Sequence, residues 1–319
     1  MSKKRKITIL ITGGAGFIGS NLVRACLRKG YLVRVIDNLS TGKKENLKDV
    51  INKIKFFKAD INNQAGLKRA MQGVDYVFHE AAMASVIRSF KEPHLVNKAN
   101  VEGTLNVLMA AKEAGVKRVV YAASSSAYGD SKVYPTKEIQ KPMPISNYGV
   151  SKLTGEYYMS VFFKLYGLET ICLRYFNVFG PFQDPHSEYA AVIPRFISAA
   201  IKNQPVTIYG DGKQTRDFTF IKNIIEANLK AITAPKNACG QTYNVALGKR
   251  VSLLDIVEGL EKYFDKKIKI DFKPPRPGDV KHSIADITLA KKNLKFRPVV
   301  NFDEGLKETI KWYIRNLKK

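Results

Sequence analysis

The sequence has few cysteines, and it has no long apolar run. Three cysteines, Cys26, Cys172 and Cys239, occur in 319 residues. Their odd number and wide spacing argue against a disulfide framework and favour free thiols in a reducing compartment. No apolar stretch reaches the ~18 residues that cross a bilayer, and no apolar signal-peptide core follows the basic first residues. We therefore expect a cytoplasmic protein that does not enter a membrane.

Acidic residues are scarce relative to basic ones. Lys and Arg number 53 and Asp and Glu 28, which gives a net charge of +25 at pH 7. Such an excess can attract nucleic acid or a small polyanion such as a nucleotide. Because the sequence has no zinc-finger spacing, helix-turn-helix signature or aromatic RNA-binding motif, we expect no nucleic-acid partner. The four histidines show no metal-ligand spacing, so we expect no metal.

Strands and helices alternate through the first half of the chain. Runs of β-branched and apolar residues predict strands, and longer periodic stretches predict helices. The expected strands are Ile7–Thr12, Tyr31–Asp37, Ile54–Asp60, Val74–His79, Lys117–Ala123 and Glu169–Tyr175. The expected helices are Phe17–Lys29, Gln64–Met71, about Pro93–Ala114 and Tyr148–Tyr166. This alternation predicts an α/β fold with a doubly wound parallel sheet of the Rossmann type.

After Asn177 the pattern changes to longer loops that are richer in proline and glycine. Short helices are expected over Ala191–Lys202 and Leu253–Phe264. We predict that residues 1–176 form a dinucleotide-binding domain, to which the chain returns near 217–246. Residues 177–319 then form mainly a smaller, interleaved α/β domain that binds the substrate.

A glycine cluster joins the first expected strand to the first expected helix. Residues 12–19 read TGGAGFIG, in which Gly14, Gly16 and Gly19 have the dinucleotide-binding spacing. Glycines allow a tight turn and close approach to a pyrophosphate, which the helix N-terminus binds. Asp37, about twenty residues further on, can accept hydrogen bonds from the adenosine ribose. Its charge would repel a 2′-phosphate, so NAD is the predicted cofactor, although basic residues lie nearby in the sequence.

A tyrosine and a lysine lie on one face at the start of the long helix. Tyr148 and Lys152 are separated by one helical turn. A free phenol has a pKa near ~10, but an adjacent ammonium and an oxidised nicotinamide favour the phenolate. Ser124 follows the fifth expected strand, where parallel sheets bind ligands, and can share a substrate oxygen with Tyr148. The three residues therefore predict proton transfer beside a dinucleotide.

Together these motifs resemble those of the extended short-chain dehydrogenase/reductase superfamily, over nearly the whole chain. The resemblance rests on the spaced glycines Gly13, Gly16 and Gly19, on Ser124–Gly129, and on Tyr148 with Lys152. Segments similar to nucleotide-sugar 4-epimerases are Asp37–Gly42, Arg174–Asn177 and Arg276–Asp279. The segments Tyr121–Asp130 and Tyr189–Pro194 are most similar to bacterial and archaeal UDP-N-acetylglucosamine 4-epimerases.

The resemblance implies an NAD-dependent 4-epimerase of UDP-sugars. In such enzymes the tyrosine, here Tyr148, takes the proton of the sugar 4-hydroxyl while hydride leaves C4 for NAD. The 4-keto sugar then turns over, and hydride returns to its other face. Lys152 would hold the nicotinamide ribose and tune Tyr148, and Ser124 would assist. The resemblance also implies a homodimer formed by the helices near 100–114 and 150–166.

The same resemblance implies two sets of binding residues. The cofactor residues are Gly13, Gly16, Phe17, Ile18, Gly19, Asp37, Asn38, Gly42, Asp60, Ile61, Ala81, Ala82, Asn100, Tyr148, Lys152 and Tyr175. The substrate residues are Ala84, Ser124, Ser125, Tyr148, Asn177, Ala191, Val192, Tyr209, Arg216, Arg276, Asp279 and Ser283. Within the second set, Arg216 and Arg276 would bind the diphosphate.

Small residues at the sugar site bear on the choice of substrate. The resemblance implies that Ser283 faces the substituent at C2 of the sugar. Because Ser283 and Ala84 are small, an N-acetyl group would fit there, which favours UDP-GlcNAc and UDP-GalNAc and does not exclude UDP-glucose and UDP-galactose.

Other functions on this scaffold are a UDP-glucuronate 4-epimerase, a dehydratase or a decarboxylase. Dehydratases of the superfamily carry an Asp-Glu pair where this chain has Ser125–Ala127. Arg88 could pair with a glucuronate carboxylate. A non-enzymatic alternative is an NAD-binding protein with a basic RNA-binding surface, against which the intact Ser124, Tyr148 and Lys152 argue.

Overall fold

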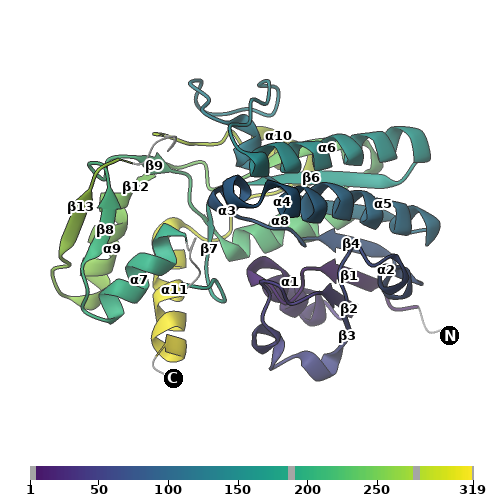
Figure 1. The fold of residues 1–319 in the computed structure, drawn as a ribbon, viewed down its shortest axis with the longest axis horizontal. Coiled ribbons are helices and arrows are strands. Elements are labelled where there is room, and N and C mark those ends of the chain that lie inside the picture. Colours follow the sequence, from purple (N-terminus) through teal and green to yellow (C-terminus); the bar gives the residue numbers. More distant parts are fainter. Residues whose placement is uncertain (1–4, 186–190, 276–280, 318–319) are drawn as a thin grey trace.

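A parallel sheet forms the centre of the molecule, with helices on both of its faces (Figure 1). The computed structural model describes residues 5–185, 191–275 and 281–317. The sheet has seven strands in the order β11-β6-β5-β4-β1-β2-β3. These are β1 (Thr8–Thr12), β2 (Leu32–Asp37), β3 (Ile54–Lys58), β4 (Tyr76–His79), β5 (Arg118–Ser124), β6 (Glu169–Tyr175) and β11 (Gln241–Val245). The predicted Rossmann-type α/β fold is confirmed.

The order of the strands reverses between β1 and β4. From β1 the chain first builds β2 and β3 on one side, and then crosses to build β4, β5 and β6 on the other. In such sheets the ligand lies at the carboxyl ends of the strands beside the reversal. All five residues of β1 are buried because helices cover both faces at this point.

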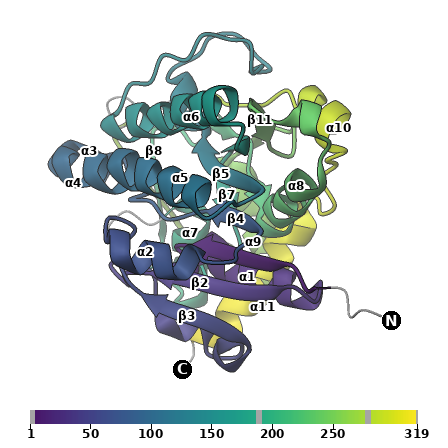
Figure 2. The same ribbon diagram turned by 90° about the vertical axis from the view of Figure 1, so that its right-hand side faces the viewer.

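Helices cover the two faces in separate layers (Figure 2). One face carries α1 (Phe17–Arg28) and α8 (Ile221–Thr233); the other carries α2 (Gln64–Met71), α5 (Gly103–Glu113) and α6 (Asn147–Tyr166). Leu22, Val23 and Cys26 of α1 are fully buried, as expected of residues three to four apart on one helix face. Two hydrophobic clusters result, one under each layer.

The helix expected over about Pro93–Ala114 is divided. It consists of α4 (Pro93–Asn97), a π-helical turn (Lys98–Glu102) and α5, and it follows an unpredicted helix, α3 (Val86–Lys91). Asn100 in the π-helical turn is buried; its Oδ1 accepts the Met83 N–H at 2.8 Å and its Nδ2 donates to Ser151 Oγ at 2.9 Å. Wide turns of this kind often occur at functional sites.

Small sheets and helices make up much of the second half of the chain. The paired strands are β7 (Val178–Phe179) with β10 (Thr219–Phe220), β8 (Val206–Tyr209) with β13 (Ile270–Lys273), and β9 (Thr215–Arg216) with β12 (Val251–Ser252). The helices are α7 (Val192–Ile201), α9 (Leu253–Phe264), α10 (Thr288–Leu294) and α11 (Phe302–Leu317). The predicted short helices are thus confirmed to within one residue, and β11 returns the chain to the main sheet beside β6.

Short 3-10 turns complete the secondary structure. They are η1 (Lys44–Leu47), η2 (Ile51–Lys53), η4 (Ser125–Tyr128) and η5 (Lys236–Ala238). The three cysteines are free and buried. Within the described ranges, no helix is long and apolar enough to cross a membrane, and no three His, Cys, Asp or Glu side chains are grouped to hold a metal ion.

Candidate active site

The carboxyl ends of four neighbouring strands bring the predicted functional residues together. In the register of the sheet, Thr12 of β1 lies beside His79 of β4. His79 lies beside Tyr121 of β5, and Ser124 at the end of β5 lies beside Tyr175 of β6. The glycine loop follows β1, so the dinucleotide motif and the Ser124 region share one edge of the sheet.

The glycine loop has the geometry of a phosphate cradle. Gly13 has a φ of +66°, and a Cβ there would lie 2.8 Å from the Ala81 Cα. A Cβ at Gly19 would collide with the Gly13 carbonyl oxygen. Helix α1 starts after Gly16, and no described side chain caps it or places an acid in its first turn. The first-turn N–H groups and the helix dipole therefore fit a pyrophosphate, as NAD requires.

Asp37 at the end of β2 is tied to the glycine loop. Its Oδ2 accepts the Ala15 N–H at 2.9 Å and its Oδ1 accepts the Leu39 N–H at 2.8 Å. Burial raises the pKa of the Asp37 carboxyl, and the two backbone hydrogen bonds counteract this effect. Asn38 donates to Asp60 Oδ2 at 2.6 Å. The structure thus brings three polar residues that are predicted to bind the cofactor, Asp37, Asn38 and Asp60, close together.

The other residues predicted around this end lie in the same part of the fold. Gly42 is buried, and a Cβ there would be 2.9 Å from both oxygens of Asp37. Phe17 and Ile18 are half-buried in the first turn of α1. Ile61 is buried in the turn after β3. The strand itself ends at Lys58, two residues earlier than predicted, because Asp60 forms a turn in which its Oδ1 accepts the Asn62 N–H.

The segment after β4 forms a second wall beside the loop. The Ala81 N–H donates to Thr12 Oγ1 at 3.1 Å, which fixes the segment to β1. Two residues later, Met83 is bound by Asn100. Ala81, Ala82 and Asn100 are predicted from the resemblance to bind the cofactor. Hydrogen bonds hold the segment that contains Ala81 and Ala82 to Thr12 on one side and to Asn100 on the other.

Helix α6 brings Tyr148 and Lys152 to the end of β5. Lys152 is buried, and its Nζ donates to the Ala122 carbonyl oxygen at 2.8 Å. The Ser124 hydroxyl lies close enough to the Tyr148 phenol to favour its ionised form by hydrogen bonding, although in this structure it donates to Ser126 Oγ at 3.0 Å. At Gly149 a Cβ would lie 2.7 Å from the Ser126 carbonyl oxygen, so glycine lets the helix approach this closely. The three residues predicted to be catalytic are thus in one place.

The pKa values of Tyr148 and Lys152 in the folded protein differ from those predicted from the sequence. The sequence predicts that Lys152 and NAD together lower the pKa of the Tyr148 phenol. In the protein alone, burial raises the pKa of Tyr148, and the hydrogen bond with Ser124 only partly offsets this. Burial also lowers the pKa of Lys152 to about 8. An additional positive charge nearby, such as that of an oxidised nicotinamide, would favour the phenolate.

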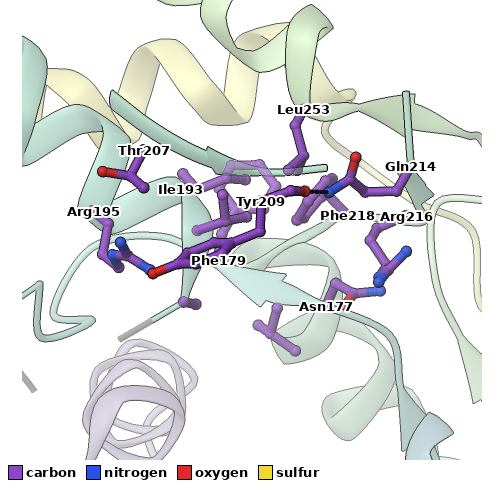
Figure 3. A pocket seen from close by; sticks show the side chains of 13 residues that line it. Asn177, Phe179, Ile193, Arg195, Thr207, Tyr209, Gln214, Arg216, Phe218 and Leu253 are labelled. Atoms are coloured by element: carbon purple, nitrogen blue, oxygen red, sulfur yellow. Dashed lines mark hydrogen bonds between the residues drawn. The ribbon is translucent and has the colours of Figure 1, made fainter. Parts of the chain in front are cut away.

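A cavity of about 280 Å³ lies within the second half of the chain, where β7, α7, β8 and β9 meet (Figure 3). Five predicted substrate residues line it: Asn177, Ala191, Val192, Tyr209 and Arg216. Other residues in its wall were not predicted from the sequence, among them Arg195, Thr207, Gln214, Phe218 and Leu253. Figure 3 shows Arg216 near Asn177, and Arg195 near the hydroxyl of Tyr209.

Ser283 joins the cavity through Asn177. The Asn177 side chain lies 3.5 Å from Ser283 Oγ and 3.3 Å from the Asp217 carbonyl oxygen, to both of which it donates. Of the other predicted substrate residues, Ser125 is half-buried beside Ser124 and Ala84 is exposed just before α3. Arg276 and Asp279 lie outside the described residues.

One polar residue of this edge was not predicted. Glu80 directly follows β4, and its Oε1 accepts the Tyr175 hydroxyl at 2.9 Å. It belongs to no motif, and only its position at a strand end could have drawn attention to it. Its neighbour His79 is bound at both ring nitrogens, by Thr12 and Thr104, and burial lowers its pKa to about 3, so it is neutral.

Known proteins share this fold and are similar in sequence over nearly the whole chain. The model of the NAD dependent epimerase/dehydratase family matches residues 9–246. A UDP-glucose 4-epimerase of Mycolicibacterium smegmatis is 37% identical over 95% of this chain and 97% of its own.

Two solved structures extend the comparison. A UDP-N-acetylglucosamine 4-epimerase from Methanobrevibacter ruminantium, in complex with UDP-N-acetylmuramic acid, is 40% identical, with a TM-score of 0.93 over 98% of this chain and 99% of its own. A UDP-glucuronic acid 4-epimerase from Bacillus cereus, in complex with UDP-glucuronic acid and NAD, is 34% identical, with a TM-score of 0.90 over 97% and 99%. The resemblance found in the sequence is thereby confirmed.

Replacing Gly19 with alanine should abolish NAD binding, because the added methyl group collides with the Gly13 carbonyl oxygen and displaces the loop. The NAD content of the purified protein and calorimetric titration with NAD measure this. Gly30→Ala is the matched control: Gly30 has a φ of +79° with open space around it, so the change costs about 1 kcal/mol of stability and leaves NAD affinity unaltered. Wild-type affinity in G19A would contradict the placement of the cofactor.

Proposed function

Because the chain belongs to the NAD dependent epimerase/dehydratase family, we propose that it interconverts UDP-N-acetylglucosamine and UDP-N-acetylgalactosamine by inverting C4 of the sugar. At the level of the family, it is an NAD-dependent enzyme that acts on UDP-sugars. The proposal is carried by the pair of Tyr148 and Ser124, whose hydroxyl groups lie within reach of each other, with Lys152 bound to the Ala122 carbonyl two residues before Ser124. This pair lies at the strand edge that also bears the glycine loop.

The described residues fit NAD along that edge. The loop from Gly13 to Gly19 would bind the pyrophosphate, and Asp37 would bind the adenosine ribose. Tyr175 and Lys152 would lie at the nicotinamide end, because both are placed at the carboxyl ends of β5 and β6. When bound, NAD supplies the acceptor for hydride from C4 and the donor for its return.

Tyr148 is the proposed acid and base. Its phenolate oxygen takes the proton of the 4-hydroxyl as the C4–O bond becomes a carbonyl, and it returns the same proton when the carbonyl is reduced on the other face. Ser124 can donate to the same sugar oxygen, since its side chain already contacts Tyr148. Lys152, one helical turn after Tyr148, would add positive charge that favours the Tyr148 phenolate. No net oxidation of the sugar results.

The cavity suits the uridine diphosphate. Arg216 and Asn177 supply a guanidinium and an amide at one place in its wall, and planar guanidinium groups suit phosphate oxygens. Ala191, Val192 and Tyr209 would contact the uridine, and Arg276 and Asp279 would complete the site. We propose accordingly that residues 1–176, with returns near 217–246, bind NAD and that 177–319 bind mainly the UDP-sugar. The buried free thiols support a cytoplasmic location.

The preference for an acetylated sugar rests on the small side chain of Ser283, which the Asn177 amide holds at the cavity. The relative from Methanobrevibacter ruminantium supports this preference. UDP-glucuronate is the second candidate, in view of the relative from Bacillus cereus. It would need a cation for the sugar carboxylate, but Arg88 is already paired with Glu92 at 2.6 Å.

Incubation with UDP-GlcNAc should yield UDP-GalNAc, detected by NMR, and the reverse reaction should reach the same equilibrium mixture. UDP-glucose should react more slowly, and UDP-glucuronate should give neither its epimer nor carbon dioxide. Faster turnover of UDP-glucuronate, or a 4-keto-6-deoxy product from any sugar, would overturn the choice of substrate and reaction.

Changing Tyr148 to phenylalanine should lower kcat by about 100-fold or more, because the proton acceptor is lost, while bound NAD is retained. Tyr166→Phe is the control: this phenol lies at the far end of the same helix and is 48% exposed, so its loss should leave kcat unchanged. Turnover of Y148F at the wild-type rate would remove Tyr148 from the mechanism.

An apolar surface on α5 and α6 supports a homodimer. The exposed side chains are Met109, Val150, Tyr157, Val161, Leu165 and Tyr166. Two copies of such helices can bury this surface against each other as a four-helix bundle.

Light scattering should therefore give a mass of about twice 35.8 kDa. The double variant V161E/L165E should be monomeric, because it places four charges in the interface of the dimer. Ile139→Glu, at a position 91% exposed in the loop before α6, should stay dimeric. A monomeric wild-type protein at micromolar concentration would refute the dimer.

A further inference from the structure

Among the described residues, a carboxylate without an ion-pair partner, that of Glu80, lies next to the proposed catalytic group. Glu80 follows β4, Tyr175 ends β6, and β5 lies between the two strands. The Tyr175 hydroxyl crosses the end of β5 to donate to Glu80 Oε1 at 2.9 Å, and Asn228 of α8 in turn donates to the Tyr175 oxygen at 2.8 Å. This chain of hydrogen bonds fixes the carboxyl group at the strand ends.

Lys152 lies near Glu80, because Glu80 and Ala122 directly follow the residues His79 and Tyr121, which are paired in the register of β4 and β5. Its Nζ is bound to the carbonyl oxygen of Ala122, on the strand that the Tyr175–Glu80 bond crosses. The Lys152 ammonium interacts electrostatically with two acids, Glu80 and Glu156. Its only hydrogen-bond acceptor among the described residues is the Ala122 carbonyl, so its charge needs compensation from nearby acids.

The two acids differ in their availability. Glu156 binds Arg174 through both carboxylate oxygens, at 2.8 Å and 2.6 Å, and this pair is buried. Its negative charge is therefore largely neutralised by the guanidinium. Glu80 has no ion pair within the described ranges, and its partner Tyr175 is uncharged. Glu80 thus offsets the charge of Lys152 more than Glu156 does.

We propose that Glu80 is a positioning residue of the reaction, whose carboxylate keeps the buried Lys152 ammonium protonated beside Tyr148. This role rests on the proposed function, because it assumes that a charged Lys152 supports the Tyr148 phenolate. Tyr175 holds the carboxylate in place, and Asn228 holds Tyr175.

The protonation equilibria give the sign of the effect. Burial lowers the pKa of Lys152 to about 8, and Glu80 is the foremost of the charges that oppose this. Burial raises the pKa of Glu80 itself to about 7, against the effects of the Tyr175 hydroxyl and of Lys152. Glu80 therefore ionises just below the pH at which Lys152 would lose its proton, which is where its charge is needed.

The other groups that face Glu80 do not replace it. Tyr175 stays neutral, since burial raises its pKa well above the ordinary value. His79, on the same strand, is neutral as well. Glu80 also raises the pKa of Tyr148 when it is ionised. On the acid side of pH 7, however, the carboxyl is protonated and this effect disappears.

The test is the titration of Lys152 in the NAD-bound enzyme. Lysine labelled at the ε-carbon gives an NMR signal that moves when the amine loses its proton, and Lys152→Met identifies the signal. In Glu80→Gln the amide oxygen can still accept from Tyr175, but the charge is gone. We expect the titration midpoint of Lys152 to fall by about one pH unit. Glu80→Asp, which keeps the charge, should restore most of the difference.

Glu138→Gln is the matched control, because it too removes the charge of a partly buried carboxylate. The Glu138 carboxylate accepts the backbone N–H of Asn244. Glu138 is not among the charges that act on Lys152, so the midpoint should stay at the wild-type value. An unchanged midpoint in E80Q, or an equal fall in E138Q, would overturn the proposal.

The pH dependence of kcat gives a second readout. In E80Q the alkaline limb should move to lower pH by about one unit, while the acid limb, where Glu80 is already protonated, stays in place. A uniform loss of kcat at every pH would indicate a structural role and contradict the proposal. Absence of turnover in the wild-type enzyme would instead refute the proposed function, and the NMR midpoint would still decide the role of Glu80.

Discussion

The attachment of helix α6 to the end of strand β5 is the constraint on which the rest of the site depends. The Lys152 amine binds the Ala122 carbonyl oxygen, and the Tyr148 phenol lies within reach of the Ser124 hydroxyl. Glycine at position 149 permits the close approach, and Ser146 caps the helix by accepting the Gly149 N–H. A small rotation of α6 would move the Tyr148 phenol away from the strand ends. The proposed acid and base would then no longer reach a bound ligand.

Other parts of the fold hold this attachment in place. The buried pair of Glu156 and Arg174 joins α6 to β6, and the Arg174 guanidinium lies 4.4 Å from the centre of the Tyr128 ring. Removing one partner of such a pair leaves a buried charge uncompensated, at a cost of about 3–5 kcal/mol. On the other side, Asp217 accepts backbone N–H groups of Leu247, Gly248 and Ala285. These bonds hold the segment next to Arg216 in the wall of the cavity.

Much of the fold and part of the site could be predicted from the sequence, because both depend on local patterns. The buried strands and the glycine loop have short sequence patterns that can be recognised without knowledge of tertiary contacts. The placement of Tyr148 and Lys152 on one face follows from helix geometry. The π-helical turn at Asn100 could not be predicted, since it depends on contacts with Met83 and Ser151 from distant segments. The same holds for cavity residues such as Arg195. The pKa of Tyr148 also escaped prediction, because burial is a property of the folded chain.

In the proposed reaction, hydride leaves C4 of the sugar and returns to the same carbon, while Tyr148 accepts and returns the proton of the 4-hydroxyl. A UDP-sugar that carries deuterium at C4 tests it most directly. After the enzyme has brought the substrate and its epimer to equilibrium in ordinary water, mass spectrometry and NMR should find the deuterium still at C4 in both sugars. Loss of the deuterium to water would mean that C4 is deprotonated rather than oxidised, and it would contradict the account.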